Sequence, residues 1–120
     1  LREHVRFTAI LYGRPEADAK TLEWLERFGL TSKLDEFPGT HSRGMRQKLA
    51  LSLALGLELP LTILDEPFNG LDLASQEMLA AGLQQRARAG GTVLLTGHQR
   101  ELESLLEARR LALQDGHLEA

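Results

Sequence analysis

Hydrophobic positions change their spacing near the middle of the chain, which predicts helices in the first half. Up to residue 57, apolar residues recur every three or four positions, so we expect helices over 2–12, 15–28 and 42–57. A connector over 30–39, punctuated by Pro38 and Gly39, has room for one short helical turn. The third helix is apolar around most of its circumference and is therefore expected to be largely buried.

Particular side chains are expected to face the core of these helices. In the first helix the candidates are Val5, Ile10 and Leu11. In the second they recur at helical spacing, at Leu22, Leu25 and Phe28.

The second half alternates short apolar runs with helical patterns. The runs at 61–65 and 92–96 predict strands, separated by a helix over 73–89 and followed by a helix over 99–107. A terminal hairpin is expected around the Asp115-Gly116 turn. Alternation of strands and helices predicts an α/β fold with parallel pairing and right-handed crossovers.

The run from Leu61 to Asp72 carries the strongest chemical signal. A continuously apolar strand, of the kind that is buried on both faces, reaches Asp65 and Glu66 and must end by Pro67, which cannot donate to a sheet. Open α/β sheets bind ligands at the carboxyl ends of their strands. Adjacent strand residues point in opposite directions, so one carboxylate can face a metal ion and the other a reacting water.

Composition excludes several classes of protein. The 120 residues make one domain or part of one, and the net charge of -3 lacks the basic footprint expected of a nucleic-acid-binding protein. The chain has no cysteine, so disulfides and thiolate metal sites are excluded. The longest apolar stretch, 49–57, is too short to span a membrane.

Four segments resemble motifs of ATP-binding cassette (ABC) nucleotide-binding domains, and they occur in that family's order. The stretch 61–65 resembles the Walker B strand, with Glu66 at the position of the catalytic glutamate, and His98 resembles the switch histidine. The signature loop is matched by Ser42, Arg43, Gly44 and Met45, and the D-loop by Asn69, Gly70, Leu71 and Asp72. The residues around the signature, 44–49, are most similar to those of exporters of the ABC-2 or haem-exporter type.

The resemblance implies a role for each motif. Asp65 would hold Mg²⁺, directly or through a water, and Glu66 would orient or deprotonate the attacking water. His98 would donate to the γ-phosphate of ATP. The signature loop would cap a nucleotide held by a partner subunit, and Asp72 would lie at the seam of that dimer.

The resemblance also shows departures and an absence. His41, Arg43 and Met45 stand where the family usually has Leu, Gly and Gln, and Gly97 stands where a Thr is more typical. The chain contains no G-x-x-x-x-G-K-[ST] loop for phosphates and no glutamine loop. We therefore expect it to be the C-terminal part of a P-loop NTPase of this family, inactive alone.

The expected organisation is a helical subdomain over 1–57, with the signature loop and helix, and part of a RecA-like ATPase core over 58–120. The complete protein would hydrolyse ATP at the cytoplasmic face of the cell membrane. Its partners would be a transmembrane permease and a second nucleotide-binding domain, with no nucleic acid.

Other interpretations remain open at this point. A soluble ABC ATPase of translation or DNA repair carries the same motifs, and a non-catalytic fragment that binds partners is a third possibility. Taken alone, Ser42 is more often a helix N-cap and His98 more often a loop histidine.

Overall fold

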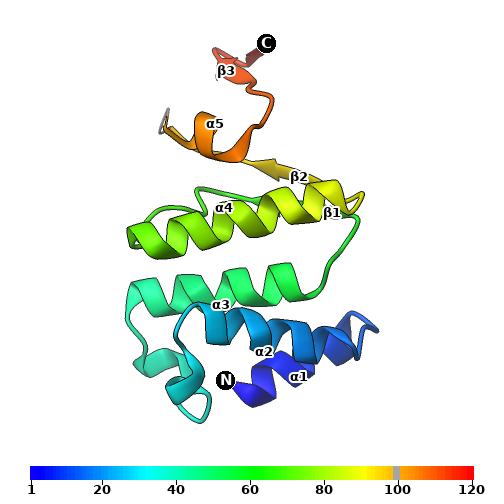
Figure 1. Ribbon diagram of the computed structural model, residues 1–120, viewed down its shortest axis with the longest axis vertical. Coiled ribbons are helices and arrows are strands. Elements are labelled where there is room, and N and C mark those ends of the chain that lie inside the picture. The colour runs from blue at the N-terminus through cyan, green and yellow to red at the C-terminus, as the bar shows by residue number, and fades with distance from the viewer. Residues whose placement is uncertain (99–100) are drawn as a thin grey trace.

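Three helices form the N-terminal half of the molecule, as expected. The computed structural model describes residues 1–98 and 101–120 and places α1 at Arg2–Leu11, α2 at Ala17–Arg27 and α3 at Arg43–Gly56 (Figure 1). Two 3-10 turns, η1 at Thr31–Lys33 and η2 at Pro38–Thr40, join α2 to α3, where one short turn was predicted.

These helices enclose an apolar cluster of their own. It consists of Leu1, Val5, Leu25, Leu30, Leu34 and Leu49. The prediction that Ile10 and Leu11 are buried was wrong, since they are 65% and 67% exposed. Val5 and Ala9, one turn apart, form the buried face of α1 instead, so Ile10 and Leu11 point away from the neighbouring helices.

The second half contains the expected strand–helix–strand unit. Strand β1 (Leu61–Leu64) leads through α4 (Leu73–Arg88) to β2 (Thr92–Leu95), and the two strands pair in parallel, with Leu61 opposite Thr92 and Leu64 opposite Leu95. Parallel pairing needs such a crossover, because a short turn cannot reverse the chain direction twice. The α/β class predicted from the sequence is therefore confirmed.

The chain ends in a short helix and a hairpin. Helix α5 spans Glu101–Leu106, and residues 99–100 of the predicted helix lie outside the described part. Strands β3 (Ala112–Gln114) and β4 (His117–Glu119) pair antiparallel around Asp115 and Gly116, whose positive φ angles of 49° and 79° suit a two-residue hairpin turn.

Only one face of the β1–β2 sheet is covered. Thr62 and Leu64 are buried, whereas Leu61 and Ile63 are 51% and 65% exposed, so β1 alternates and the expectation of burial on both faces was wrong. The exposed face continues on β2 at Leu94. The reason is that α4 packs against one face, while no element of the described chain covers the other.

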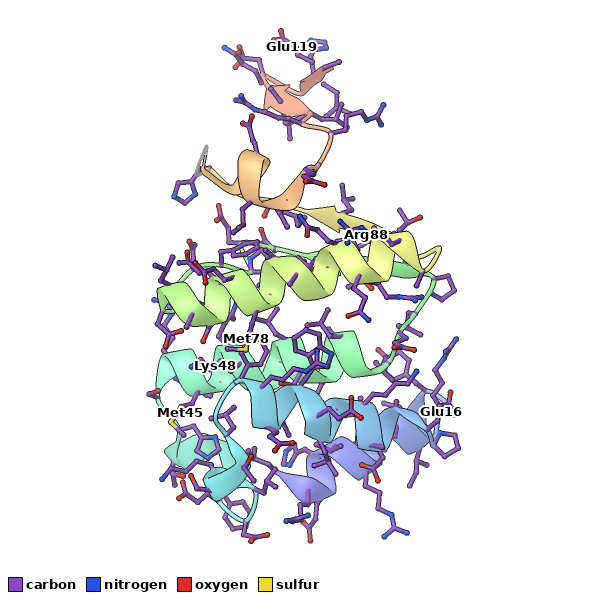
Figure 2. The ribbon with its side chains drawn as sticks, in the orientation of Figure 1. Glu16, Met45, Lys48, Met78, Arg88 and Glu119 are labelled. Carbon is purple, nitrogen blue, oxygen red and sulfur yellow. The ribbon has the colours of Figure 1, made fainter. Side chains whose placement is uncertain are left out.

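A central core joins the two halves. Helices α3 and α4 run side by side, with Met78 between them (Figures 1 and 2). This core contains Phe28, Leu51, Leu55, Leu64, Phe68, Leu71, Leu79, Ala80, Leu83 and Leu106. The molecule measures 44 × 29 × 25 Å, with the N-terminus at the helical end and the terminal hairpin at the other.

None of the helices in the described residues is long and apolar enough to cross a membrane. Among those same residues, no three metal-ligating side chains form a group that could hold an ion by themselves.

Candidate functional site

The site begins where the paired strands β1 and β2 end. The Thr96 N–H donates to the Leu64 carbonyl at 3.0 Å, which extends the pairing by one residue and sets Asp65 beside Thr96. The Thr96 hydroxyl donates to Asp65 Oδ1 at 2.5 Å and accepts from the Glu66 N–H at 2.9 Å. The Asp65 carboxylate and the Glu66 N–H, at the carboxyl end of the sheet, are thus joined through one hydroxyl.

Glu66 leaves the strand in a left-handed conformation, with φ of 48°. Its carbonyl accepts from the Asn69 N–H at 3.2 Å, so the chain turns immediately after Asp65. The two carboxylates were expected to diverge through strand alternation. Their contacts do differ, since that of Asp65 meets Thr96 and that of Glu66 meets His98. Strand alternation is not the reason, because β1 ends at Leu64 and a turn begins at Glu66.

The Glu66 carboxylate meets His98, which was singled out from the sequence. Nδ1 of His98 lies 2.9 Å from Glu66 Oε1, across 32 residues of sequence. The His98 side chain is 70% exposed and that of Glu66 38%, so both groups are accessible to a molecule that binds at this edge.

The segment that resembles the signature loop begins α3. Ser42 Oγ accepts from the Met45 N–H at 3.2 Å and is the N-cap of the helix. The Met45 side chain packs against the helical apolar cluster, whereas Arg43 and Gly44 border a pocket. The four residues therefore divide between capping, packing and the pocket.

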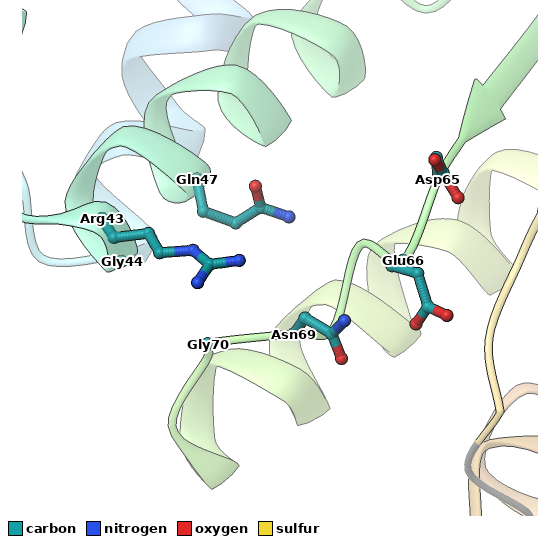
Figure 3. Close-up of a pocket in the computed structure, with 7 residues that line it drawn as sticks. All are labelled: Arg43, Gly44, Gln47, Asp65, Glu66, Asn69 and Gly70. Carbon is teal, nitrogen blue, oxygen red and sulfur yellow. The ribbon is translucent and has the colours of Figure 1, made fainter.

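Asp65 and Glu66 share that pocket with the start of α3 (Figure 3). It has a volume of about 150 Å³ and is open to solvent. Its walls are Arg43, Gly44, Gln47, Asp65, Glu66, Asn69 and Gly70. Residues about twenty positions apart in sequence, from the signature-like and D-loop-like segments, thus meet in one depression.

Direct contacts fasten the 65–72 loop to α3. Gln47 Nε2 donates to the Pro67 carbonyl at 3.1 Å, and Lys48 Nζ lies 3.9 Å from Asp72 Oδ2. At Gly44 a Cβ atom would lie 3.3 Å from the Gly70 carbonyl oxygen, so a larger residue there would require the loop to shift by a few tenths of an ångström.

Asp72 and Leu71 hold the end of this loop. Leu71 is buried in the central core, and Asp72 Oδ1 accepts from the Ser75 N–H at 2.9 Å as the N-cap of α4. The pKa of the Asp72 carboxyl lies below its ordinary value, because the Ser75 side chain and then its N–H favour the carboxylate, with Lys48 adding a smaller attraction.

His41, which departs from the usual signature leucine, is buried. Its Nε2 lies 3.5 Å from Glu36 Oε2, and neither ring nitrogen has a hydrogen-bond partner in the described part of the chain. The pKa of the Glu36 carboxyl is lowered, chiefly by its hydrogen bond from Lys33 and less by His41.

Two further residues, Thr96 and Gln47, contact the site, although neither was singled out from the sequence. Thr96 was assigned only as a strand end and Gln47 only as a helix position. A parallel pairing register would have placed Thr96 beside Asp65, because Leu64 and Leu95 are partners. For Gln47 the sequence carries no comparable signal.

Comparisons with known proteins agree with this geometry. A family model described as "ABC transporter" matches residues 1–69. The cytochrome c biogenesis ATP-binding export protein CcmA of Aromatoleum aromaticum is 38% identical over 81% of this chain, which spans 46% of that protein. The ABC transporter ATP-binding protein NatA of Bacillus subtilis is 32% identical over 89% of this chain, which spans 45% of it.

A human protein and a solved structure extend the comparison. The human phospholipid-transporting ATPase ABCA7 is 38% identical over 96% of this chain and 6% of its own length. A solved ATP binding subunit of an ABC transporter superposes with a TM-score of 0.79 and 35% identity, over 85% of this chain and 43% of its own. The chain thus spans less than half the length of each of these relatives, and it belongs to the ABC transporter ATP-binding family.

Proposed function

We propose that this chain supplies the water-activating and metal-holding part of an ATPase site that drives transport across a membrane. The observation that carries the proposal is the pairing of Glu66 with His98 beside Asp65, at the carboxyl end of a parallel sheet. This is the edge at which α/β proteins bind nucleotides. Family membership supports the same reaction.

Glu66 has the position that a general base requires. Its carboxylate is partly exposed at the rim of the pocket, where it can accept a proton from a water or orient that water. His98 contacts Glu66 Oε1 through Nδ1 and keeps Nε2 for a second partner, for which we propose a γ-phosphate oxygen of ATP. Because both of these oxygens accept, each ring nitrogen would carry a hydrogen while both contacts are made. Loss of that phosphate would then remove one hydrogen-bond partner of His98 and so alter its contact with Glu66.

Asp65 is the residue that we propose holds Mg²⁺. Magnesium prefers oxygen ligands and is commonly bound by one or two carboxylates, together with substrate phosphates and retained waters. Asp65 Oδ1 is engaged by Thr96, so Oδ2 remains the better-placed ligand atom. The single carboxylate fits an ion whose other ligands come from ATP and water, and the ion would neutralise charge on the phosphates.

The pocket supports the idea that this chain holds only part of a nucleotide site. Its volume of about 150 Å³ is below the roughly 300–1,000 Å³ of sites that enclose small ligands. We propose that a phosphate-binding loop elsewhere in the complete protein supplies the rest, and that the chain alone does not hydrolyse ATP.

We propose that Ser42, Arg43, Gly44 and Met45 cap a nucleotide bound by a second nucleotide-binding domain, with Asn69, Gly70, Leu71 and Asp72 at the dimer seam. The first N–H groups of a helix lack intrahelical acceptors and favour anions, which supports this role for the start of α3.

In the complete protein we propose a helical subdomain over 1–57 and part of the ATPase core over 58–120. A transmembrane permease would be its partner at the cytoplasmic face of the membrane. The names of the relatives described above refer to transport or export, which favours this reading over translation or DNA repair.

The proposal is tested by replacing Glu66 in the complete cassette that contains this chain. Glu66→Gln removes the base but keeps the size of the side chain, so steady-state ATP turnover should fall by about 10²–10⁴-fold. ATP-driven dimerisation, measured by sedimentation, should persist because the binding contacts remain.

Glu77→Gln is the matched control, because Glu77 is an exposed residue of α4 away from the pocket. It should leave turnover unchanged. Undiminished turnover in the Glu66→Gln cassette would contradict the proposal.

A further inference from the structure

We infer that Thr96 is a positioning residue for this reaction, whose hydroxyl holds Asp65 and Glu66 in their working arrangement. This inference rests on the proposed function. It concerns a side chain whose role follows from its contacts in the structure: one oxygen atom lies 2.5 Å from Asp65 Oδ1 and 2.9 Å from the Glu66 nitrogen.

The hydroxyl fits both tasks because it carries one donor and two acceptor lone pairs. Its hydrogen goes to the Asp65 carboxylate, and a lone pair receives the Glu66 N–H. The bond to Asp65 restrains the rotation of that carboxylate, and Oδ2 is the atom that would meet the proposed ion. A hydrogen bond to a charged group is among the stronger ones in proteins.

The bond from Glu66 acts on an unfavourable backbone. Glu66 has φ of 48°, a region that residues with a Cβ seldom occupy. The Glu66 carbonyl is held by Asn69 and its N–H by Thr96, so the residue is fixed on both sides. Without the hydroxyl, the N–H side is released and the Glu66 carboxylate is held less firmly against His98.

The positioning role of the Thr96 hydroxyl can be separated from the contribution of the Thr96 backbone to strand pairing. Pairing of β2 with β1 at this point uses the Thr96 backbone N–H, which donates to Leu64 and does not depend on the side chain. The Thr96 side chain is exposed, so an isosteric replacement creates no buried cavity. Removing the hydroxyl should therefore change the geometry of the two carboxylates while the sheet remains.

The test measures ATP hydrolysis by the complete cassette with Thr96→Val, Thr96→Ser and Thr92→Val. Thr96→Val should lower kcat by roughly 10- to 100-fold, the loss expected for a hydrogen bond to a charged group. The KM for ATP should stay within about twofold of the parent, since nucleotide binding is left intact. Thr96→Ser should restore most of kcat because it restores the hydroxyl.

Thr92→Val is the matched control, since it makes the same exchange in an exposed residue at the opposite end of β2. It should leave both constants unchanged. An unchanged kcat in Thr96→Val would overturn the inference, as would a Thr96→Ser cassette as slow as Thr96→Val, or a parallel loss in Thr92→Val.

A second measurement reads the proposed contact without catalysis. In the complete cassette without nucleotide, the Glu66 amide hydrogen should exchange at least about tenfold faster in Thr96→Val than in Thr96→Ser, because its acceptor is gone. Equal exchange in the two variants would overturn the inference.

The two proposals fail in different ways. If Glu66→Gln abolishes hydrolysis and Thr96→Val does not reduce it, the Thr96 inference fails and the proposed function stands. If the Glu66→Gln cassette hydrolyses ATP at the normal rate, the proposed function fails, and the Thr96 inference fails too because it rests on that function.

Discussion

Glu66 combines a reactive side chain with an unfavourable backbone conformation. Its φ of 48° costs a residue with a Cβ about 1–2 kcal/mol relative to glycine. Hydrogen bonds to Thr96 and Asn69 offset that cost and hold the carboxylate toward His98. A glycine here would relieve the cost of the left-handed backbone but would remove the carboxylate.

Replacing Glu66 by glycine separates stability from activity. Glu66→Gly should raise the free energy of unfolding by about 1 kcal/mol, because glycine adopts positive φ without strain. Urea unfolding of the 120-residue chain measures this change. The same exchange at Glu77, within helix α4, should instead lower the free energy of unfolding by about 1 kcal/mol. Destabilisation by Glu66→Gly would show that the left-handed conformation carries no cost.

The residues of the site differ in how far the sequence could predict them. Asp65 and Glu66 were predictable because a strand, two carboxylates and a proline are adjacent in the chain. The contact between Thr96 and Asp65 spans 31 residues, and that of Gln47 with Pro67 spans 20. Such contacts depend on strand register and helix packing, which no local pattern encodes.

At the scale of elements, α3 is the structural link between the helical half and the site. One side of it packs on α2, where Gly56 lies against Thr21 so closely that a Cβ would be 2.1 Å from Thr21 Oγ1 and 2.8 Å from Thr21 Cα. The other end, at Gly44 and Gln47, contacts the 65–72 loop. A shift of α3 against α2 would therefore be transmitted to the pocket.

Gly56→Ala tests how tightly α2 and α3 are packed. Alanine in a helix normally stabilises by about 0.5–1 kcal/mol relative to glycine. Here the clash with the Thr21 backbone should reverse that sign and lower the free energy of unfolding by about 1–3 kcal/mol, as measured by urea titration. Gly39→Ala is the control, because nothing lies within 4 Å of its added Cβ. A stabilised Gly56→Ala chain would contradict the close packing.

The positions of helices and strands along the chain were predicted from the sequence more accurately than which of their faces are buried. Apolar spacing predicted α1, yet Ile10 and Leu11 are exposed while the small Ala9 is buried. A hydrophobic pattern cannot tell which of two apolar stripes meets a neighbour. Similarly, the apolar run of β1 predicted burial on both faces, although Leu61 and Ile63 remain exposed.

At the scale of the whole molecule, a continuous core carries a small, open pocket at the carboxyl end of its sheet. The sheet offers two paired strands, one covered face and a carboxylate cluster at its end, while the pocket beside that cluster is only about 150 Å³. The chain spans less than half the length of its relatives, and none of its residues forms a phosphate-binding loop of the G-x-x-x-x-G-K-[ST] type. These features support the proposal that this chain supplies one part of an ATPase site and other segments of the complete protein supply the rest.

Calorimetric titration of the 120-residue chain with Mg²⁺ and ATP tests this account most directly. We predict a dissociation constant weaker than about 1 mM, because the carboxylates alone repel the phosphates and no loop cradles them. Asp65→Asn should leave this weak binding essentially unchanged. Binding of one ATP per chain with a dissociation constant of about 1 μM, abolished by Asp65→Asn, would contradict the account. The chain would then hold a complete nucleotide site.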